Sequence, residues 1–363
     1  MYQKELNALK KANRFRQRKV WNKNLIDFAS NDYLGLANNK NQLQKALKLL
    51  NEYDNHAPKA SMLVNGYHEI HKQFEQTLAR LNRFEEGMIV GSGFLANMGL
   101  IEALVRKSDR LFIDEEYHAS GMMATGLLAD RVIKFKHNDP EDLEDKLKSF
   151  GGKGRKIIAV EGVYSMSGEL CDRAIFELAD RYEALLIVDE AHSSGVIGQN
   201  LLGIFEYYNI TPHSRHIKMG TLGKAYGSYG AYILASSHII SFLINRGKPM
   251  IYSTAPSVID TALALVNIEY VAKNAQKFYK KIKKRHKIIK DELNIEISSL
   301  ILTLPMPSNS ATISKQKELI EEGFLIGAIR QPTVNQPILR IIPRIGSSKQ
   351  NLLKLCKNVK ITV

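Results

Sequence analysis

The stretch LLIVDEAH, at residues 185–192, is the most informative part of this chain of 363 residues. Its four apolar residues predict a buried strand that ends at Asp189, and His192 follows three positions later. A second stretch, KMGTLGKA at residues 218–225, places Lys224 among small residues. The two stretches together supply a carboxylate, an imidazole and an amine directly after predicted strands.

These three groups fit the chemistry of pyridoxal phosphate. Such an enzyme needs a lysine amine for the cofactor aldehyde and a carboxylate for the pyridinium nitrogen. His192 could reach the phenolic oxygen of the ring. Taken alone, Asp189 could equally cap the next helix and Lys224 could lie in a solvated loop, but the combination favours the cofactor site.

Short apolar segments alternate with helical segments from about residue 86. The predicted strands are 87–90, 110–114, 131–135, 156–160, 185–189, 216–219 and 230–234, and the predicted helices are 94–105, 119–128, 140–150 and 172–182. This alternation predicts an α/β fold with a mostly parallel sheet covered by helices on both faces. The carboxyl ends of parallel strands share one edge of the sheet, so the residues after them are expected to meet there.

The pattern changes after about residue 258. A helical stretch extends to about residue 293, and apolar segments follow at 297–304, 323–329 and 338–342. We therefore expect a smaller C-terminal α/β domain. The predicted organisation is an N-terminal segment at 1–45, a large cofactor-binding domain at 46–270 and a small domain at 271–363.

The segment GSGFLAN, at residues 91–97, follows a predicted strand and opens a predicted helix. Backbone amides at a helix N-terminus bind phosphate, which suggests a role for Gly93 and Phe94. The same letters match a loose dinucleotide fingerprint with Asp114 about 20 residues on. A nicotinamide-dependent oxidoreductase is therefore an alternative, although about 86 residues precede the motif.

The net charge of +14 could indicate a nucleic acid or another anionic partner. The letters DEAH at 189–192 also occur in helicases, but the chain lacks the phosphate loop that such an ATPase requires. No run combines basic residues with interleaved aromatic ones, so we expect a lysine-rich surface and no nucleic-acid partner.

Targeting and metal-binding signals are weak. Residues 1–19 lack the apolar core of a secretory signal, and the apolar stretch 88–105 is interrupted by Asn97 and Glu102, so no membrane span is expected. Two cysteines are too few for a disulfide framework, which favours a cytoplasmic protein. His68, His71 and Glu75 share a helical face without a further strong ligand, and no metal site is expected.

Several motifs together resemble the α-oxoamine synthases, a family of pyridoxal-phosphate enzymes of fold type I. They are ASNDYLGL at 29–36, GSGFLAN at 91–97, HAS at 118–120, KHND at 136–139, EGVYSMSG at 161–168, DEAHSSGVIG at 189–198, TLGK at 221–224 and AIRQPTV at 328–334. They occur in the order of the family and cover nearly the whole chain.

The resemblance implies a role for each candidate residue. The catalytic residues are Lys224, His118 and Asp189, of which Lys224 binds the cofactor, His118 stacks on its ring and Asp189 pairs with the ring nitrogen. The remaining cofactor-binding residues are Gly93, Phe94, Ser165, His192 and Thr221. The substrate-binding residues are Arg14, His118, Thr333 and Arg340, with Arg340 on the carboxylate of the amino acid. Family members are homodimers, in which Ser253 and Thr254 could reach the phosphate bound by the partner.

The implied reaction is the decarboxylative condensation of L-alanine with a pimeloyl thioester, a step of biotin synthesis. The donor could be a coenzyme A ester or an acyl carrier protein, and the basic charge would suit either. A sister reaction that uses glycine or serine with another acyl-CoA is the near alternative.

Overall fold

The computed structural model describes residues 1–360, which form two compact units. The larger unit comprises Leu34–Ser165 and Glu169–Lys280. The smaller unit comprises Met1–Tyr33, Met166–Gly168 and the described residues from Lys281 onward. The domain limits at residues 45 and 270 stay a prediction from the sequence.

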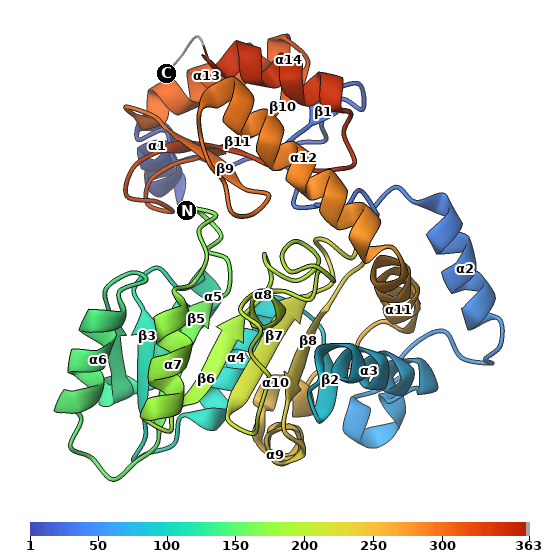
Figure 1. The fold of residues 1–363 in the computed structure, drawn as a ribbon, viewed down its shortest axis with the longest axis vertical. Helices are drawn as coiled ribbons and strands as arrows, with labels where there is room; N and C mark the ends of the chain where they lie inside the picture. Colours follow the sequence, from blue (N-terminus) through green and yellow to red (C-terminus); the bar gives the residue numbers. More distant parts are fainter. Residues whose placement is uncertain (361–363) are drawn as a thin grey trace. The chain divides into compact units, whose positions relative to one another are not determined.

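The larger unit is built on a seven-stranded sheet (Figure 1). In spatial order the strands are β2 (Glu86–Val90), β8 (Ala231–Ala235), β7 (His216–Thr221), β6 (Leu185–Asp189), β5 (Lys156–Glu161), β3 (Arg110–Asp114) and β4 (Val132–Phe135). The mostly parallel sheet is thus confirmed. The exception is β8, which runs antiparallel to both neighbours. The chain passes from β7 to β8 through a short loop without a crossover helix, and such a connection permits only antiparallel pairing.

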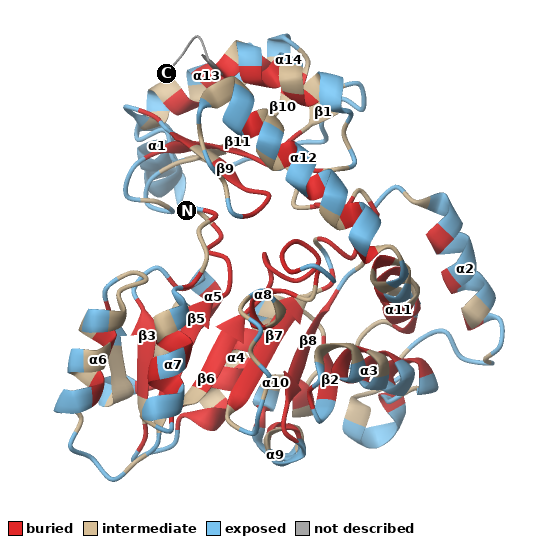
Figure 2. Cartoon of the chain, in the orientation of Figure 1, coloured by how far each residue is buried: buried red, intermediate tan, exposed pale blue. Residues whose placement is uncertain are grey.

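Helices cover both faces of this sheet, and the strands other than the edge strand β4 are almost entirely buried (Figure 2). One face packs against α4 (Gly93–Leu104), α5 (Ala119–Thr125), α9 (Ser237–Arg246) and α10 (Lys248–Ile251). The other face is covered by α3 (Glu69–Asn82), α6 (Pro140–Ser149), α7 (Arg173–Arg181) and α8 (Ile204–Tyr207). Apolar side chains therefore point to both faces, as expected for central strands of an α/β sheet.

The remaining helices of the larger unit surround this core. α2 (Lys40–Leu50) packs against α11 (Val258–Lys273), and α11 also contacts α3. The stretch that we expected to be continuous from 258 to 293 is two helices, because α11 ends at Lys273, Asn274 caps it, and α12 (Ala275–Leu293) follows. Within residues 1–360, no helix is both long and apolar enough to cross a bilayer.

The smaller unit contains two small sheets. β1 (Ile26–Asp27) pairs with β10 (Phe324–Leu325), and β12 (Ile338–Ile341) pairs with both β11 (Gly327–Ile329) and β9 (Leu302–Pro305). Its other helices are α1 (Gln3–Lys11), α13 (Asn309–Glu321) and α14 (Lys349–Lys360). Buried Arg344 forms ion pairs with Asp27 and Asp32, which fastens the N-terminal segment to the C-terminal part of this unit.

His137 connects the loops that follow three strands of the large sheet. Its Nδ1 lies 2.9 Å from Asp114 at the end of β3, and its Nε2 lies 2.5 Å from Glu169 in the segment after β5. The hydroxyl of Tyr164 donates to the same Asp114 at 2.7 Å. Burial lowers the pKa of His137, but the hydrogen bonds to Asp114 and Glu169 outweigh it and raise the pKa to about 10.

Replacing His137 by alanine is expected to lower the free energy of unfolding by about 2–3 kcal/mol at mildly acidic pH. The folded-state pKa lies above the ordinary value of 6.5, so the contribution of this cation is complete below pH 6.5 and is lost as the pH rises to about 10. Urea unfolding of both proteins across this range measures the difference. His56→Ala, at an exposed histidine, is the control, and a difference that stays constant from pH 6.5 to 10 would contradict the assignment.

Candidate active site

A pocket of about 230 Å³ lies at the carboxyl edge of the large sheet. It contains seven of the candidate residues predicted from the sequence: Gly93, Phe94, His118, Asp189, His192, Thr221 and Lys224. Asn97, Glu161, Ala191 and Met219 complete its lining. The strands β2, β3, β5, β6 and β7 all end here, which is why residues far apart in the sequence meet in one place.

Lys224 lies in the loop between β7 and β8, and its Nζ is 3.0 Å from Nε2 of His192. The loop that carries His192 passes close to the loop that carries Lys224. At Gly195, which has a φ of +79°, an added Cβ would lie 2.4 Å from the Cβ of Ala225. A side chain at Gly195 would therefore separate the two loops and move the imidazole away from the amine.

Asp189 ends β6 and is held by two donors. Its Oδ2 accepts from Nδ2 of Asn97 at 2.8 Å, and its Oδ1 accepts from the backbone N–H of Ala191 at 2.9 Å. The carbonyl oxygen of the same Asn97 accepts from the hydroxyl of Tyr117 at 2.8 Å. These bonds orient a carboxylate that is only 4% exposed.

The same network reaches His118. Asn97 also donates to Oγ of Ser120 at 2.9 Å, and Ser120 Oγ lies 2.7 Å from Nδ1 of His118. Partial burial lowers the pKa of His118, and the nearby charge of Lys224 lowers it further, while Asp189 opposes this effect. The result is a neutral imidazole at neutral pH, suited to stacking on a flat ring.

The part of the pocket lined by Gly93, Phe94 and Thr221 fits a phosphate group. It includes the N-terminus of α4, which is capped by Ser92, and the amides of the first helical turn, such as those of Gly93 and Phe94, are available to bind an anion there. An added Cβ at Gly93 would lie 2.6 Å from the methyl group of Thr221, so only glycine keeps this space open. Among the described residues, the buried Oγ1 of Thr221 has no hydrogen-bond partner, and a bound phosphate would supply one.

The dinucleotide alternative for this segment conflicts with the sheet. The glycines at 91–93 follow β2, which is an edge strand paired only with the antiparallel β8. A Rossmann fingerprint follows a strand inside a parallel sheet. The segment therefore suits a single phosphate group better than a dinucleotide.

Two residues of this site were missed in the sequence, and one predicted residue lies beside it. Asn97 and Glu161 occur within quoted motifs but received no role. Asn97 is one of two polar residues in a largely apolar helix, the other being Glu102, and this was the available signal. Ser165 does not line the pocket, and its backbone N–H donates to Oε2 of Glu161 at 3.0 Å.

The predicted substrate residues other than His118 lie in the smaller unit. Arg14 and Thr333 line a hollow of about 260 Å³ together with Arg16 and Arg330, and Arg16 donates to Oγ1 of Thr333 at 2.9 Å. Its lining includes three guanidinium groups and, among the described residues, no carboxylate. Arg340, on β12, is 6% exposed and donates to Oδ1 of Asn31 at 2.9 Å.

The residues predicted to contact a partner chain follow α10. The hydroxyl of Ser253 donates to the carbonyl of Pro249. Its role toward a second chain, like that of Thr254, stays a prediction.

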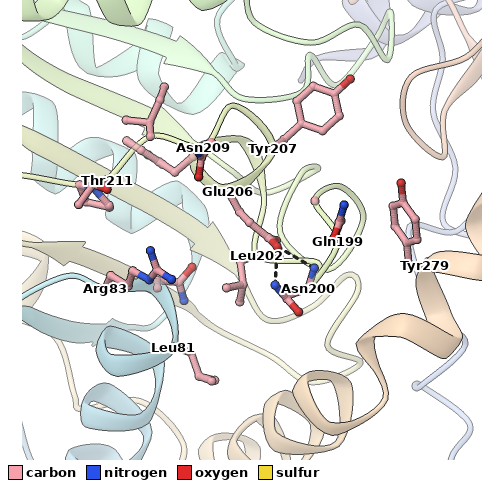
Figure 3. A pocket seen from close by; sticks show the side chains of 15 residues that line it. Leu81, Arg83, Gln199, Asn200, Leu202, Glu206, Tyr207, Asn209, Thr211 and Tyr279 are labelled. Carbon is pink, nitrogen blue, oxygen red and sulfur yellow. Dashed lines mark hydrogen bonds between the residues drawn. The ribbon is translucent and has the colours of Figure 1, made fainter.

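A larger cavity of about 680 Å³ lies elsewhere in the larger unit (Figure 3). Tyr207, Tyr279 and Arg83 line it, and Glu206 is hydrogen-bonded to the backbone and side chain of Asn200. None of the predicted site residues lines this cavity. The smaller pocket with Lys224 is therefore the candidate active site.

Asp180, His213 and His216 form a cluster with the residue types of a metal site. However, Nδ1 of His213 accepts from the N–H of Arg215 at 3.2 Å, and Nδ1 of His216 accepts from the N–H of His213 at 3.4 Å. In the neutral rings, Nε2 therefore carries the proton and faces Asp180. Metal-bound histidine normally donates from its other nitrogen, whereas both Nδ1 atoms here accept hydrogen bonds, so the cluster does not fit a metal site.

Comparison with known proteins identifies the family of the chain. The family model for aminotransferase class I and II matches residues 23–359. The 8-amino-7-oxononanoate synthase of Helicobacter pylori is 44% identical over 356 residues, which cover 98% of this chain and 95% of that protein. A putative 8-amino-7-oxononanoate synthase of Aquifex aeolicus is 34% identical over 361 residues, covering 96% and 95% of the two chains.

Two solved structures share the fold. The 8-amino-7-oxononanoate synthase of Francisella tularensis superimposes with a TM-score of 0.77 at 25% identity, covering 93% of this chain and 97% of that one. A serine palmitoyltransferase of S. paucimobilis with bound PLP gives a TM-score of 0.87 at 20% identity, covering 93% and 87% of the two chains, and supports the fold alone. The chain therefore belongs to the aminotransferase class I and II family and, within it, to the α-oxoamine synthases.

Proposed function

We propose that the protein condenses L-alanine with a pimeloyl thioester to give 8-amino-7-oxononanoate, carbon dioxide and the free thiol, as a step of biotin biosynthesis. The cofactor is pyridoxal 5′-phosphate. The observation that carries the proposal is the pocket in which the amine of Lys224, the imidazole of His192 and the carboxylate of Asp189 meet beside the first residues of α4. The identity of 44% with the relative from Helicobacter pylori supports the choice of reaction within the family.

Each end of the cofactor has matching residues in this pocket. Thr221 and the amides of Gly93 and Phe94 would bind the phosphate. Asp189, fixed by Asn97, would hold a proton on the pyridine nitrogen. Lys224 would be the residue that binds the aldehyde, with His192 near the phenolic oxygen. Ser165 lies outside this lining, and its contact with the cofactor stays a prediction.

When bound, pyridoxal phosphate supplies a carbonyl for the amino group of alanine and a ring that withdraws electrons from its α-carbon. Lys224 Nζ accepts the α-proton as general base and later returns a proton to the product. His192 lies 3.0 Å from this amine and holds it by a hydrogen bond. His118, whose pKa is lowered by partial burial, would cover one face of the ring and exclude water from it.

The residues of the smaller unit would bind the acidic groups of the substrates. We assign the carboxylate of alanine to Arg340, a buried guanidinium on β12. We assign the acyl donor to Arg14 and Thr333, because three guanidinium groups around one hollow favour an anion such as a terminal carboxylate or a phosphate. The donor would be a coenzyme A ester or an acidic acyl carrier protein.

We further propose a cytoplasmic homodimer. The two cysteines, Cys171 and Cys356, are buried free thiols, which suits a reducing compartment. In the dimer, Ser253 and Thr254 would contribute to the phosphate site of the partner.

Product analysis tests the reaction directly. The purified enzyme, loaded with pyridoxal phosphate, is incubated with alanine, glycine or serine and with pimeloyl-CoA or a pimeloyl carrier protein. We expect 8-amino-7-oxononanoate from alanine, with carbon dioxide and thiol in equal amounts, by mass spectrometry and thiol assay. Turnover with glycine or serine but not with alanine would identify a sister synthase instead.

Replacing Arg14 by glutamine is expected to raise KM for the pimeloyl donor roughly tenfold, because a charge-assisted hydrogen bond to the anionic donor is lost. KM for alanine should stay within about twofold, since we place alanine on Arg340. Arg18→Gln removes the same charge from an exposed position outside the hollow and serves as control. Equal effects of the two substitutions would show that overall charge, and not this hollow, binds the donor.

A further inference from the structure

The pocket contains a second carboxyl group that the proposed mechanism does not use. Glu161 ends β5 and pairs in register with Asp189 on the adjacent parallel strand β6. Residues paired in this way direct their side chains to the same face of a sheet, and both line the pocket with Lys224. Glu161 is 2% exposed and Asp189 is 4% exposed, so water screens neither group well.

The two carboxyl groups have different hydrogen-bond partners. Both oxygens of Asp189 accept hydrogen bonds, one from Asn97 and one from the N–H of Ala191. Glu161 accepts from the N–H of Ser165 through Oε2, whereas its buried Oε1 has no hydrogen-bond partner within residues 1–360. An ionised carboxylate with an unsatisfied buried oxygen is costly, so the negative charge belongs on Asp189.

The charged groups around Glu161 agree with this assignment. Burial raises the pKa of Glu161 well above its usual range, the charge of Asp189 on β6 raises it further, and Asp114 on β3 acts in the same direction. The amine of Lys224, after β7, opposes this shift. Burial and the neighbouring carboxylates thus favour the neutral acid form of Glu161, and a neutral acid can donate a hydrogen bond where a carboxylate can only accept one.

We propose that Glu161 is a further cofactor-binding residue, which donates a hydrogen bond from Oε1 to an oxygen atom of bound pyridoxal phosphate while Oε2 holds the backbone of Ser165. This inference rests on the proposed function. Asp189 and Glu161, on adjacent strands, then have complementary hydrogen-bonding roles toward the cofactor. Asp189 accepts from the protonated ring nitrogen, and Glu161 donates to an oxygen of the same molecule.

Two substitutions separate this role from a purely structural one. Glu161→Gln keeps the size and a donor group without any ionisable proton, and Glu161→Met keeps the size without a donor. The dissociation constant of pyridoxal phosphate is measured by absorbance titration of the apo-protein. We expect the glutamine variant to stay within about threefold of the wild type and the methionine variant to bind roughly tenfold more weakly. Wild-type affinity in the methionine variant, or equal losses in both variants, would overturn the proposal.

A measurement on the wild-type protein keeps the test independent of variant folding. Infrared difference spectra of the loaded minus the cofactor-free protein should show the C=O band of a protonated carboxyl group that shifts when the cofactor binds. This band should be absent from the glutamine variant. Its absence from the wild type would overturn the proposal for Glu161, whereas a wild-type apo-protein that does not bind pyridoxal phosphate at all would overturn the proposed function.

Discussion

The site depends on the common direction of β2, β3, β5, β6 and β7. Because these strands run the same way, their carboxyl ends and the segments after them meet at one edge of the sheet, and each contributes at least one residue to a single pocket. The contact of 3.0 Å between Lys224 and His192 joins residues from two different loops, and it requires β6 and β7 to lie side by side in their observed register.

Within the pocket, the hydrogen-bond donors around each carboxyl group and ring favour its charged or its neutral form. Asn97 donates to Asp189 and to Ser120, which in turn bonds His118, so one buried amide orients an anion and a neutral ring together. Glu161 lies next to Asp189 with fewer donors and a raised pKa. Two carboxyl groups on paired strands can thus take different protonation states, which gives a cofactor ring both an acceptor and a donor.

The sequence predicted most of the large sheet, because strands and helices alternate clearly from residue 86 to residue 235. It did not predict the direction of β8, which depends on a missing crossover, nor the break at Asn274 between α11 and α12. Seven candidate residues meet in one pocket because each ends a strand, lies within three residues after one or stands at the start of a helix. Asn97 and Glu161 could not be assigned in this way, since their roles arise from contacts such as that between Asn97 and Asp189, 92 positions apart.

The central claim is that the amine of Lys224 binds pyridoxal phosphate covalently next to Asp189. Borohydride reduction of the loaded enzyme, followed by proteolysis and mass spectrometry, locates the modified lysine directly. Our account predicts a single phosphopyridoxyl group, on the peptide that contains Lys224, and no labelling of this peptide in Lys224→Ala. A label on another lysine, for example the buried Lys218 six positions earlier, would contradict the account.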